Sequence, residues 1–336
     1  MLSPPERGYR LPALGLGAMY PTALQVQAKT LRGRLTVGVK RSALVTGDAG
    51  FVGGAMRKAL AARGWETVGV DVKRPCHWAD ARDYFRGADE RFDLVVHCAA
   101  VVGGRQLIEG SPLSLAVDLS IDAELFGWAV RTKPGRIVYY SSSAAYPTHL
   151  QYGADGYRLA ERHIDLSDLD GAPDLTYGWA KLTGEMLAER ARAAGVPVTV
   201  LRPFSGYGEA QDLSYPFPAI AQRVLRQENP LTVWGDGTQV RDWVHIDDVV
   251  GMTLACIDQE VDGPLNICTG MPTSFLRLAH LMAQAAGYAP EIRPVESMPS
   301  GVEWRVGDPT KSHRIYAPTV SLSDGIDRML AAGVRA

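Results

Sequence analysis

Cysteine is scarce in this sequence of 336 residues, and no two cysteines form a C-x-x-C pair. The four cysteines are Cys76, Cys98, Cys256 and Cys268. Their scatter argues against a zinc site and against a disulfide framework. Free thiols are typical of a reducing compartment. We therefore expect a cytoplasmic protein without a bound metal.

An excess of charge of one sign is also missing. Lysine and arginine together number 35, aspartate and glutamate 37, and the net charge is -2. Proteins that bind nucleic acid or an anionic membrane surface through charge carry a basic surplus. The sequence therefore favours a protein that acts on a small molecule, with neither nucleic acid nor membrane as a partner.

Long apolar runs are absent, so no membrane span is predicted. Residues 11–24 are moderately apolar, but Pro12 and Pro21 interrupt them, which argues against a signal peptide. We expect residues 1–40 to form an N-terminal extension, or to reflect an upstream start codon with Met19 as another candidate start.

Internal repeats and low-complexity segments are absent as well. The first half instead alternates short apolar runs with segments of helical pattern. We expect strands at 42–46, 67–72, 94–98, 136–140 and 198–202, with helices at 53–63 and from about Tyr177 onward. This rhythm predicts an α/β fold of the Rossmann type, a doubly wound parallel sheet with helices on both faces.

The second half has a different composition, with prolines and glycines clustered at 203–218. We expect strands at 231–234 and 264–268, and helices at 218–226, 246–258 and 274–286. These elements predict a smaller mixed α/β lobe at the carboxyl edge of the sheet, where open α/β sheets bind ligands. The predicted domains are residues 41–202, which hold the doubly wound sheet, and residues 203–336, a lobe for substrate, with some chain crossing between them.

The strongest single motif is TGDAGFVG, which begins at Thr46. Its glycines, Gly47, Gly50 and Gly53, follow a predicted strand and open a predicted helix, with Phe51 and Val52 between the last two. Glycine lets the backbone turn tightly and approach a pyrophosphate, while the helix N-terminus offers free N–H groups. The motif therefore predicts a dinucleotide site.

Acidic residues after the next strand refine the choice of cofactor. Asp71 ends that strand, where its carboxylate would bind the adenosine ribose hydroxyls and repel a 2′-phosphate. This favours NAD over NADP, although Lys73 and Arg74 leave room for NADP. Asp80, followed by Ala81, could bond the adenine amino group or could simply lie on the surface.

A tyrosine and a lysine stand four residues apart in Tyr177-Gly-Trp-Ala-Lys181. On a helix this spacing places both on one face. A nearby ammonium lowers the pKa of a phenol and makes it a usable proton acceptor and donor. The strand at 136–140 ends in three serines, 141–143, whose hydroxyls could bond a substrate oxygen or cap the loop.

Together these residues resemble the NAD-dependent epimerase/dehydratase family, the extended short-chain dehydrogenases/reductases. The resemblance covers about residues 41–326. Its motifs come in family order: TGDAGFVG, Asp71, Asp80, HCAA from His97, SSSAAYP from Ser141, YGWAK from Tyr177, RPF from Arg202, GDGTQVRDWVHIDD from Gly235, GDPTK from Gly307 and SLSDGI from Ser321.

The resemblance implies roles for individual residues. Tyr177 would be the acid/base, Lys181 would bond the nicotinamide ribose, and Ser142 would be the catalytic hydroxyl, with Ser143 in reserve as a substrate neighbour. Ala99, Ala100 and Phe204 would lie along the cofactor, and Ser205 would face the sugar. Arg241 would bind the substrate diphosphate, unless it pairs on the surface with Asp242, and Arg305 is a weaker candidate for the same charge.

The resemblance also separates reactions. Family dehydratases carry Asp and Glu where this chain has Ser143 and Ala144, decarboxylases carry Glu at the second position, and 3,5-epimerising members carry Cys there. Alanine cannot exchange a proton, so oxidation and reduction alone are favoured.

The leading hypothesis is therefore an NAD-dependent nucleotide-sugar epimerase acting at C4. A keto-sugar reductase using NAD(P)H is the alternative, ahead of a 4,6-dehydratase. A non-catalytic dinucleotide-sensing protein is a different class. We also expect a homodimer formed through the Tyr177 helix and the helix near 120–130.

Three departures from the family pattern stand out. Ser143 and Tyr177 lie 34 positions apart, about ten more than expected, with an insert near 151–170. That insert is either a surface excursion or a wall that shapes the substrate site. Ser205 replaces a usual Asn, and Asp118 replaces an Asn common on its helix, so an unusual sugar is expected.

Overall fold

The computed structural model describes residues 40–74, 79–104, 108, 110, 113–153 and 156–333. Cys76 and, apart from Lys40, the predicted N-terminal extension lie outside these residues. Among the described residues, no helix combines the length and the apolar character needed to cross a bilayer.

A six-stranded parallel sheet forms the centre of the molecule, with the strand order β2-β1-β3-β4-β5-β9. The strands are β1 (Ser42–Thr46), β2 (Glu66–Val70), β3 (Leu94–His97), β4 (Ile137–Tyr140), β5 (Val198–Pro203) and β9 (Gly263–Ile267). Strands such as β3 and β4 are buried throughout, as expected for a sheet covered on both faces. The predicted Rossmann-type α/β fold is confirmed.

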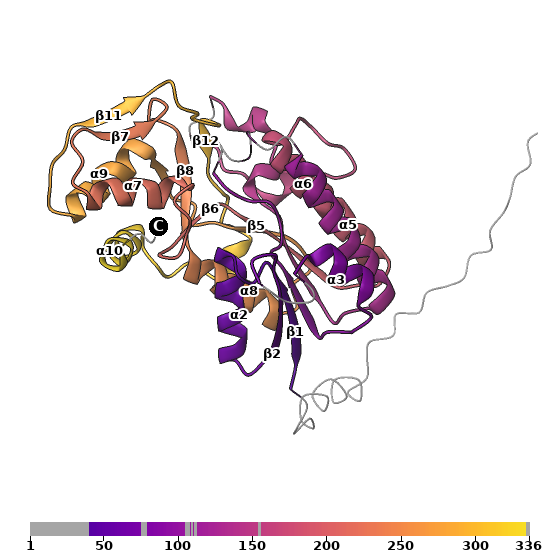
Figure 1. Cartoon of the computed structure of the whole chain (residues 1–336). Coiled ribbons are helices and arrows are strands. Elements are labelled where there is room, and N and C mark those ends of the chain that lie inside the picture. The colour runs from indigo at the N-terminus through magenta and orange to yellow at the C-terminus, as the bar shows by residue number, and fades with distance from the viewer. Residues whose placement is uncertain are drawn as a thin grey trace, which may run out of the picture. The chain divides into compact units, whose positions relative to one another are not determined.

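Helices cover both faces of this sheet (Figure 1). On one face lie α2 (Phe51–Ala62) and α8 (Ile246–Asp258). On the other lie α3 (Ala81–Gly87), α5 (Ser114–Thr132) and α6 (Leu175–Ala193). Alternation along β1 divides the two cores, because Ala43 and Val45 face the first group and Leu44 the second.

Two elements assigned from sequence to the smaller lobe belong to the central layers instead. The strand predicted at 264–268 is β9, which pairs with β5 as the sixth strand of the main sheet. Helix α8 packs its Val249 and Met252 into the same core as Met56 of α2. Short apolar runs carry no information about which sheet they join, so the sequence alone misplaced them.

The smaller lobe holds a core of its own, in which Phe217, Trp243 and Phe275 pack together. Its strands are β6 (Ser205–Tyr207), β7 (Leu231–Trp234), β8 (Val240–His245), β10 (Pro272–Ser274), β11 (Ile292–Val295) and β12 (Trp304–Arg305). Its helices are α7 (Pro216–Leu225), α9 (Phe275–Ala285) and α10 (Leu322–Ala332). Strand β8 pairs with β6, β10 and β12, and β7 pairs with β11.

The insert between the serines and Tyr177 is partly folded into the body of the protein. Leu159 is buried and bridges to Gly307. The Glu161 carboxylate accepts the N–H of Asn266 at 2.9 Å. Residues 165–172 are instead mostly exposed. Part of the insert is therefore a surface excursion and part is anchored against the end of β9.

Candidate functional site

The glycine loop between β1 and α2 has the geometry of a phosphate cradle. Gly47 adopts a φ of +68°, and a Cβ there would lie 2.8 Å from the Cys98 carbonyl. A Cβ on Gly53 would collide with the Gly47 oxygen. Helix α2 begins after Gly50 without a side-chain cap, so its first N–H groups remain available to an anion. The loop fits the diphosphate of a dinucleotide.

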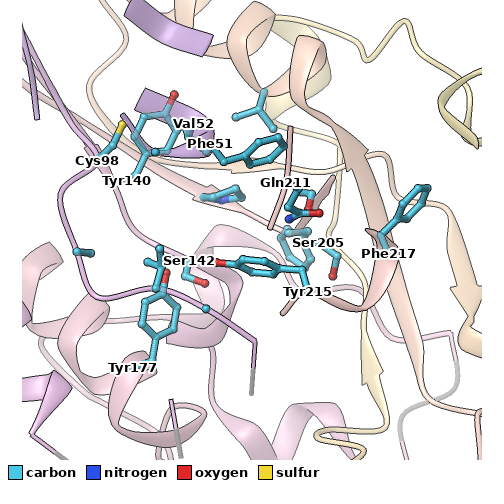
Figure 2. A pocket seen from close by; sticks show the side chains of 18 of the residues that line it. Phe51, Val52, Cys98, Tyr140, Ser142, Tyr177, Ser205, Gln211, Tyr215 and Phe217 are labelled. Carbon is cyan, nitrogen blue, oxygen red and sulfur yellow. The ribbon is translucent and has the colours of Figure 1, made fainter. Parts of the chain in front are cut away.

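A cavity of about 320 Å³ opens beside this loop, and we call it the cofactor compartment (Figure 2). Most residues predicted for the cofactor line it: Gly47, Gly50, Phe51, Val52, Gly53, Ala100, Tyr177, Lys181 and Phe204. Ser205, predicted for the sugar, lines it as well. The motifs therefore converge on one cleft.

The remaining predicted cofactor residues lie outside that lining. The Asp71 carboxylate accepts the N–H of Ala49 at 2.9 Å and of Lys73 at 2.8 Å. This places Asp71 against the glycine loop, where a ribose would bind. The Ala99 N–H binds the Thr46 hydroxyl at 3.2 Å.

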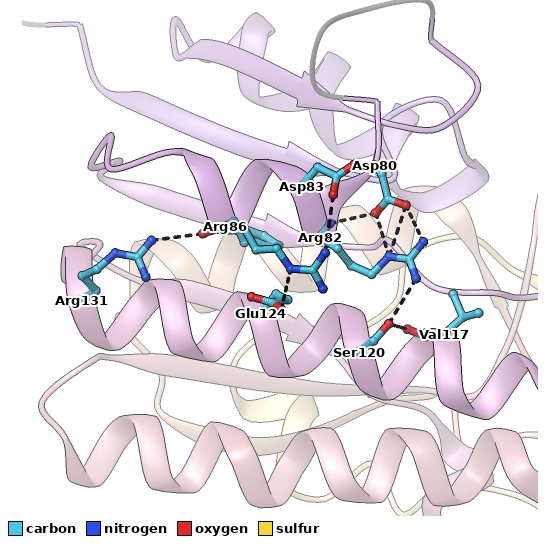
Figure 3. Close-up of polar contacts among 9 residues, drawn as sticks. Asp80, Arg82, Asp83, Arg86, Val117, Ser120, Glu124 and Arg131 are labelled. Atoms are coloured by element: carbon cyan, nitrogen blue, oxygen red, sulfur yellow. Dashed lines mark hydrogen bonds and ion pairs between the residues drawn. The ribbon is translucent and has the colours of Figure 1, made fainter.

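Asp80 caps α3, and its carboxylate accepts hydrogen bonds from the backbone and guanidinium of Arg82 (Figure 3). The side-chain bond from Arg82 lowers the pKa of Asp80. Ala81 is buried behind it. These contacts give Asp80 a structural role, and its contact with adenine stays a prediction.

The reactive pair lies where α6 begins. The Lys181 ammonium is buried and lies 5.7 Å from the centre of the Tyr177 ring. Tyr177 and Ser142 both line the cofactor compartment. Burial raises the pKa of Tyr177, whereas Lys181 and Ser142 lower it. The net direction is upward, so the lowered pKa expected from sequence is wrong for the protein alone, because the phenol is shielded from water.

Two carboxylates, those of Asp118 and Asp122, lie close enough to Lys181 to act on its charge. Asp118 accepts the Val101 N–H at 2.6 Å, and Asp122 accepts the Tyr139 hydroxyl at 2.6 Å. Burial raises the pKa of Asp118 to about 6, against the opposing charge of Lys181. Burial lowers the pKa of Lys181, but Tyr177, Asp122 and Asp118 outweigh it and leave that pKa raised. The ammonium therefore stays charged.

A second cavity of about 700 Å³ adjoins the first and shares Ser142, Tyr177 and Arg241 with it. We call it the substrate compartment. The Arg241 guanidinium donates to the Val240 and Val302 carbonyls at 2.8 Å, which fixes its orientation. Asp242 is turned to other donors, the N–H groups of Thr269 and Gly270 among them.

The other predicted substrate residues separate into two groups. Arg305 lines the substrate compartment and is held by Asp174 at 2.7 Å and by the Gln151 side chain at 2.6 Å. Gln151 begins the insert, so the insert helps to shape this wall. Ser143 is buried in a 3₁₀ turn and is not among the described residues that line either compartment.

Among the cleft residues that sequence reasoning missed, Tyr215 and Arg223 carry polar groups. Tyr215 extends its ring towards Ser142 (Figure 2), and burial together with Tyr177 raises its pKa. Arg223 of α7 lines the substrate compartment, and its Nε finds no hydrogen-bond partner among the described residues. The proline at 216 signals a helix start but not which face meets the cleft.

Comparison with known proteins settles the family. Residues 43–268 match the model of the NAD dependent epimerase/dehydratase family. The chain belongs to this family. NAD is the cofactor of the family, and its members modify nucleotide sugars, so the glycine loop and the Tyr177 helix lie in an NAD-dependent enzyme of nucleotide-sugar metabolism.

Individual relatives carry several activities. The dTDP-4-dehydro-6-deoxy-D-allose reductase of Streptomyces bikiniensis is 27% identical over 82% of this chain and 90% of its own. The GDP-L-fucose synthase of Escherichia coli is 26% identical over 85% of this chain and 94% of its own. A solved structure of a tyrosine-to-phenylalanine mutant of the UDP-glucuronic acid 4-epimerase from Bacillus cereus, in complex with NAD and a fluorinated sugar nucleotide, is 25% identical. The match covers 87% of this chain and 98% of that one, with a TM-score of 0.70.

The fold is shared more widely. The UDP-glucose 4-epimerase of Thermotoga maritima superposes with a TM-score of 0.76 at 24% identity, over 87% of this chain and 98% of that one.

Proposed function

We propose that this protein is a nucleotide-sugar 4-epimerase that works through a transient 4-keto sugar. The observation that carries the proposal is the place of Tyr177 and Ser142 at the junction of the two compartments. A sugar in one compartment then meets the cofactor in the other at these two hydroxyls. Bound NAD would supply a reversible acceptor for the hydride on C4.

Tyr177 acts on the C4 hydroxyl. As phenolate it takes the proton from that oxygen while the hydride leaves carbon, which yields the ketone. After the sugar turns over, the return of hydride and proton gives the epimer. Lys181 stabilises the phenolate because its ammonium stays charged, and Ser142 can donate to the C4 oxygen as negative charge changes on it.

The charges of the substrate compartment suit a nucleoside diphosphate. Arg305 is paired with Asp174, and the other arginines that line this compartment within the described part of the chain are Arg241 and Arg223. Two positive charges match the two negative charges of a diphosphate.

Ala144 supports oxidation and reduction without further chemistry. It is buried and lines the substrate compartment where dehydratases and decarboxylases of the family carry a group that exchanges protons. A methyl group can neither remove a hydroxyl nor protonate an enolate. This feature speaks against a 4,6-dehydratase.

A keto-sugar reductase is the second candidate, because the relatives from Streptomyces and Escherichia coli include a reductase of a 4-keto sugar. Such an enzyme needs the same Tyr177 and Ser142. It differs in that each turnover consumes a reduced cofactor.

The deciding experiment incubates the purified protein with UDP-, dTDP- and GDP-hexoses and follows the configuration at C4 by NMR. The epimerase proposal expects a C4 epimer without net change in NADH. Conversion only of 4-keto sugars, with one NADH oxidised per product, would replace it with the reductase. NAD binding without any turnover would instead favour a dinucleotide-sensing protein.

A further inference from the structure

Within the glycine loop, one carboxylate is enclosed by two arginines. Asp48 is buried, and its oxygens lie 2.6 Å from the Arg57 guanidinium and 2.8 Å from that of Arg74. The Arg74 Nε adds a hydrogen bond of 2.9 Å. The two arginine side chains are 35% and 40% exposed, whereas the carboxylate is fully covered. An anion thus fills a site that two guanidiniums form.

The backbone is shaped to admit this carboxylate. A Cβ on Gly69 of β2 would collide with the Asp48 carboxylate oxygen. Any other residue at 69 would displace the carboxylate from between the arginines. Asp48 is therefore a built feature of the loop rather than a solvated side chain.

The cluster of Asp48, Arg57 and Arg74 lies close to the position expected for the adenosine ribose of the cofactor. Ala49, the neighbour of Asp48, donates its N–H to Asp71 at 2.9 Å. Arg74 donates its N–H to the Asp71 carbonyl at 2.9 Å. Arg74 is thus close to the residue expected to hold the adenosine ribose, and it is one of the two basic residues that leave room for a 2′-phosphate.

We propose that Asp48 is a second determinant of cofactor choice, which holds Arg57 and Arg74 so that they cannot receive the 2′-phosphate of NADP. The 2′-phosphate of NADP would be repelled by the negative charges of Asp48 and Asp71. It could not displace the Asp48 carboxylate, which is covalently part of the glycine loop. This role of Asp48 is distinct from that of Asp71, the acid that follows β2 and would bind the ribose hydroxyls. It does not depend on which sugar the protein converts.

The first test measures binding of NAD⁺ and NADP⁺ to the full chain, stripped of dinucleotide, by calorimetry. Asp48→Asn removes the competing anion with little change in shape. We expect the Kd for NADP⁺ to fall about tenfold, because a released guanidinium can form one charge-assisted hydrogen bond with the 2′-phosphate. The Kd for NAD⁺ should stay within about twofold. Asp258→Asn, which breaks a surface pair with Arg63, is the matched control and should change neither.

The second test assigns the tighter binding to the released arginine. In the Asp48→Asn background, Arg74→Ala should return the Kd for NADP⁺ most of the way to its original value. A folded Asp48→Asn protein with unchanged NADP⁺ affinity would overturn the proposal. So would tighter binding that persists after both Arg57 and Arg74 are replaced by alanine, because simple loss of negative charge would then explain it.

A third measurement decides the matter even if Asp48→Asn fails to fold. In the native background Arg74 is held by Asp48, so Arg74→Ala should leave the Kd for NADP⁺ within about twofold. A loss of tenfold or more there would mean that Arg74 already serves the 2′-phosphate, which contradicts the proposal. None of these readouts uses sugar turnover, so failure of the epimerase proposal would leave them intact.

Discussion

The two compartments of the cleft differ in how the groups suited to binding phosphate are assembled. In the cofactor compartment, the phosphate cradle comes from one continuous stretch, residues 47–53, and Asp71 beside it already accepts the N–H groups of Ala49 and Lys73. The substrate compartment draws its charged groups from separate segments, Arg223 from α7, Arg241 from β8 and Arg305 from β12. The phosphate cradle is therefore set by local sequence, whereas the charges of the substrate compartment are brought together by tertiary packing.

This difference assigns different work to the two halves. A glycine cradle suits the diphosphate of any dinucleotide, so it leaves little to vary. Guanidiniums carried by separate elements can be repositioned by changes in the loops between them. We infer that the choice of sugar is encoded in the smaller lobe and in the insert that contributes Gln151.

The largest expected effect lies at the junction of the compartments. Tyr177→Phe removes only the hydroxyl that exchanges the substrate proton, so turnover should fall roughly 10²- to 10⁴-fold. The Kd for NAD should remain nearly unchanged, because the glycine loop is untouched. Calorimetry and the NMR assay measure the two quantities. Tyr152→Phe, on an exposed tyrosine, is the control. Full activity in Tyr177→Phe would remove the proposed acid/base.

Asp118 is the acid near the cofactor compartment whose charged form is most clearly disfavoured by burial, although it accepts the Val101 N–H. Its pKa in the folded protein is raised by burial to about 6, from an ordinary 3.8. Between these values the folded protein retains a proton that the unfolded chain has lost, so stability falls as pH rises through this window, and the cost is constant above about pH 6. Asp118→Asn keeps an acceptor for the Val101 N–H and removes the charge.

We therefore expect Asp118→Asn to raise the free energy of unfolding by about 2 kcal/mol at pH 7.5, and by about half as much at pH 5. Urea unfolding at both pH values measures the difference. Glu124→Gln, on the exposed side of the same helix, should change stability by less than about 0.5 kcal/mol. A stabilisation by Asp118→Asn that grew as the pH fell would have the wrong sign and would refute the buried-charge interpretation.

The same contrast explains what the sequence could predict. The glycine spacing, the Tyr177–Lys181 pair and β1 were predictable because each depends on residues close together in the chain. The assignment of β9 failed because a buried five-residue strand carries no mark of its neighbours. The pKa of Tyr177 was misjudged because the lysine is visible in the sequence and the burial is not.

Arg223 remained hidden for a related reason, and it gives the smallest predicted effect. An arginine near the end of an amphipathic helix is usually a solvated residue, and only packing turns this one into the substrate compartment. Arg223 lines the substrate compartment and not the cofactor compartment. Arg223→Gln should therefore raise the KM for the sugar nucleotide about tenfold, with kcat and the Kd for NAD unchanged. Steady-state kinetics and calorimetry test this, with Arg226→Gln, on an exposed arginine three positions on, as the control. An equal loss of NAD affinity would show that the two compartments are not separate in function.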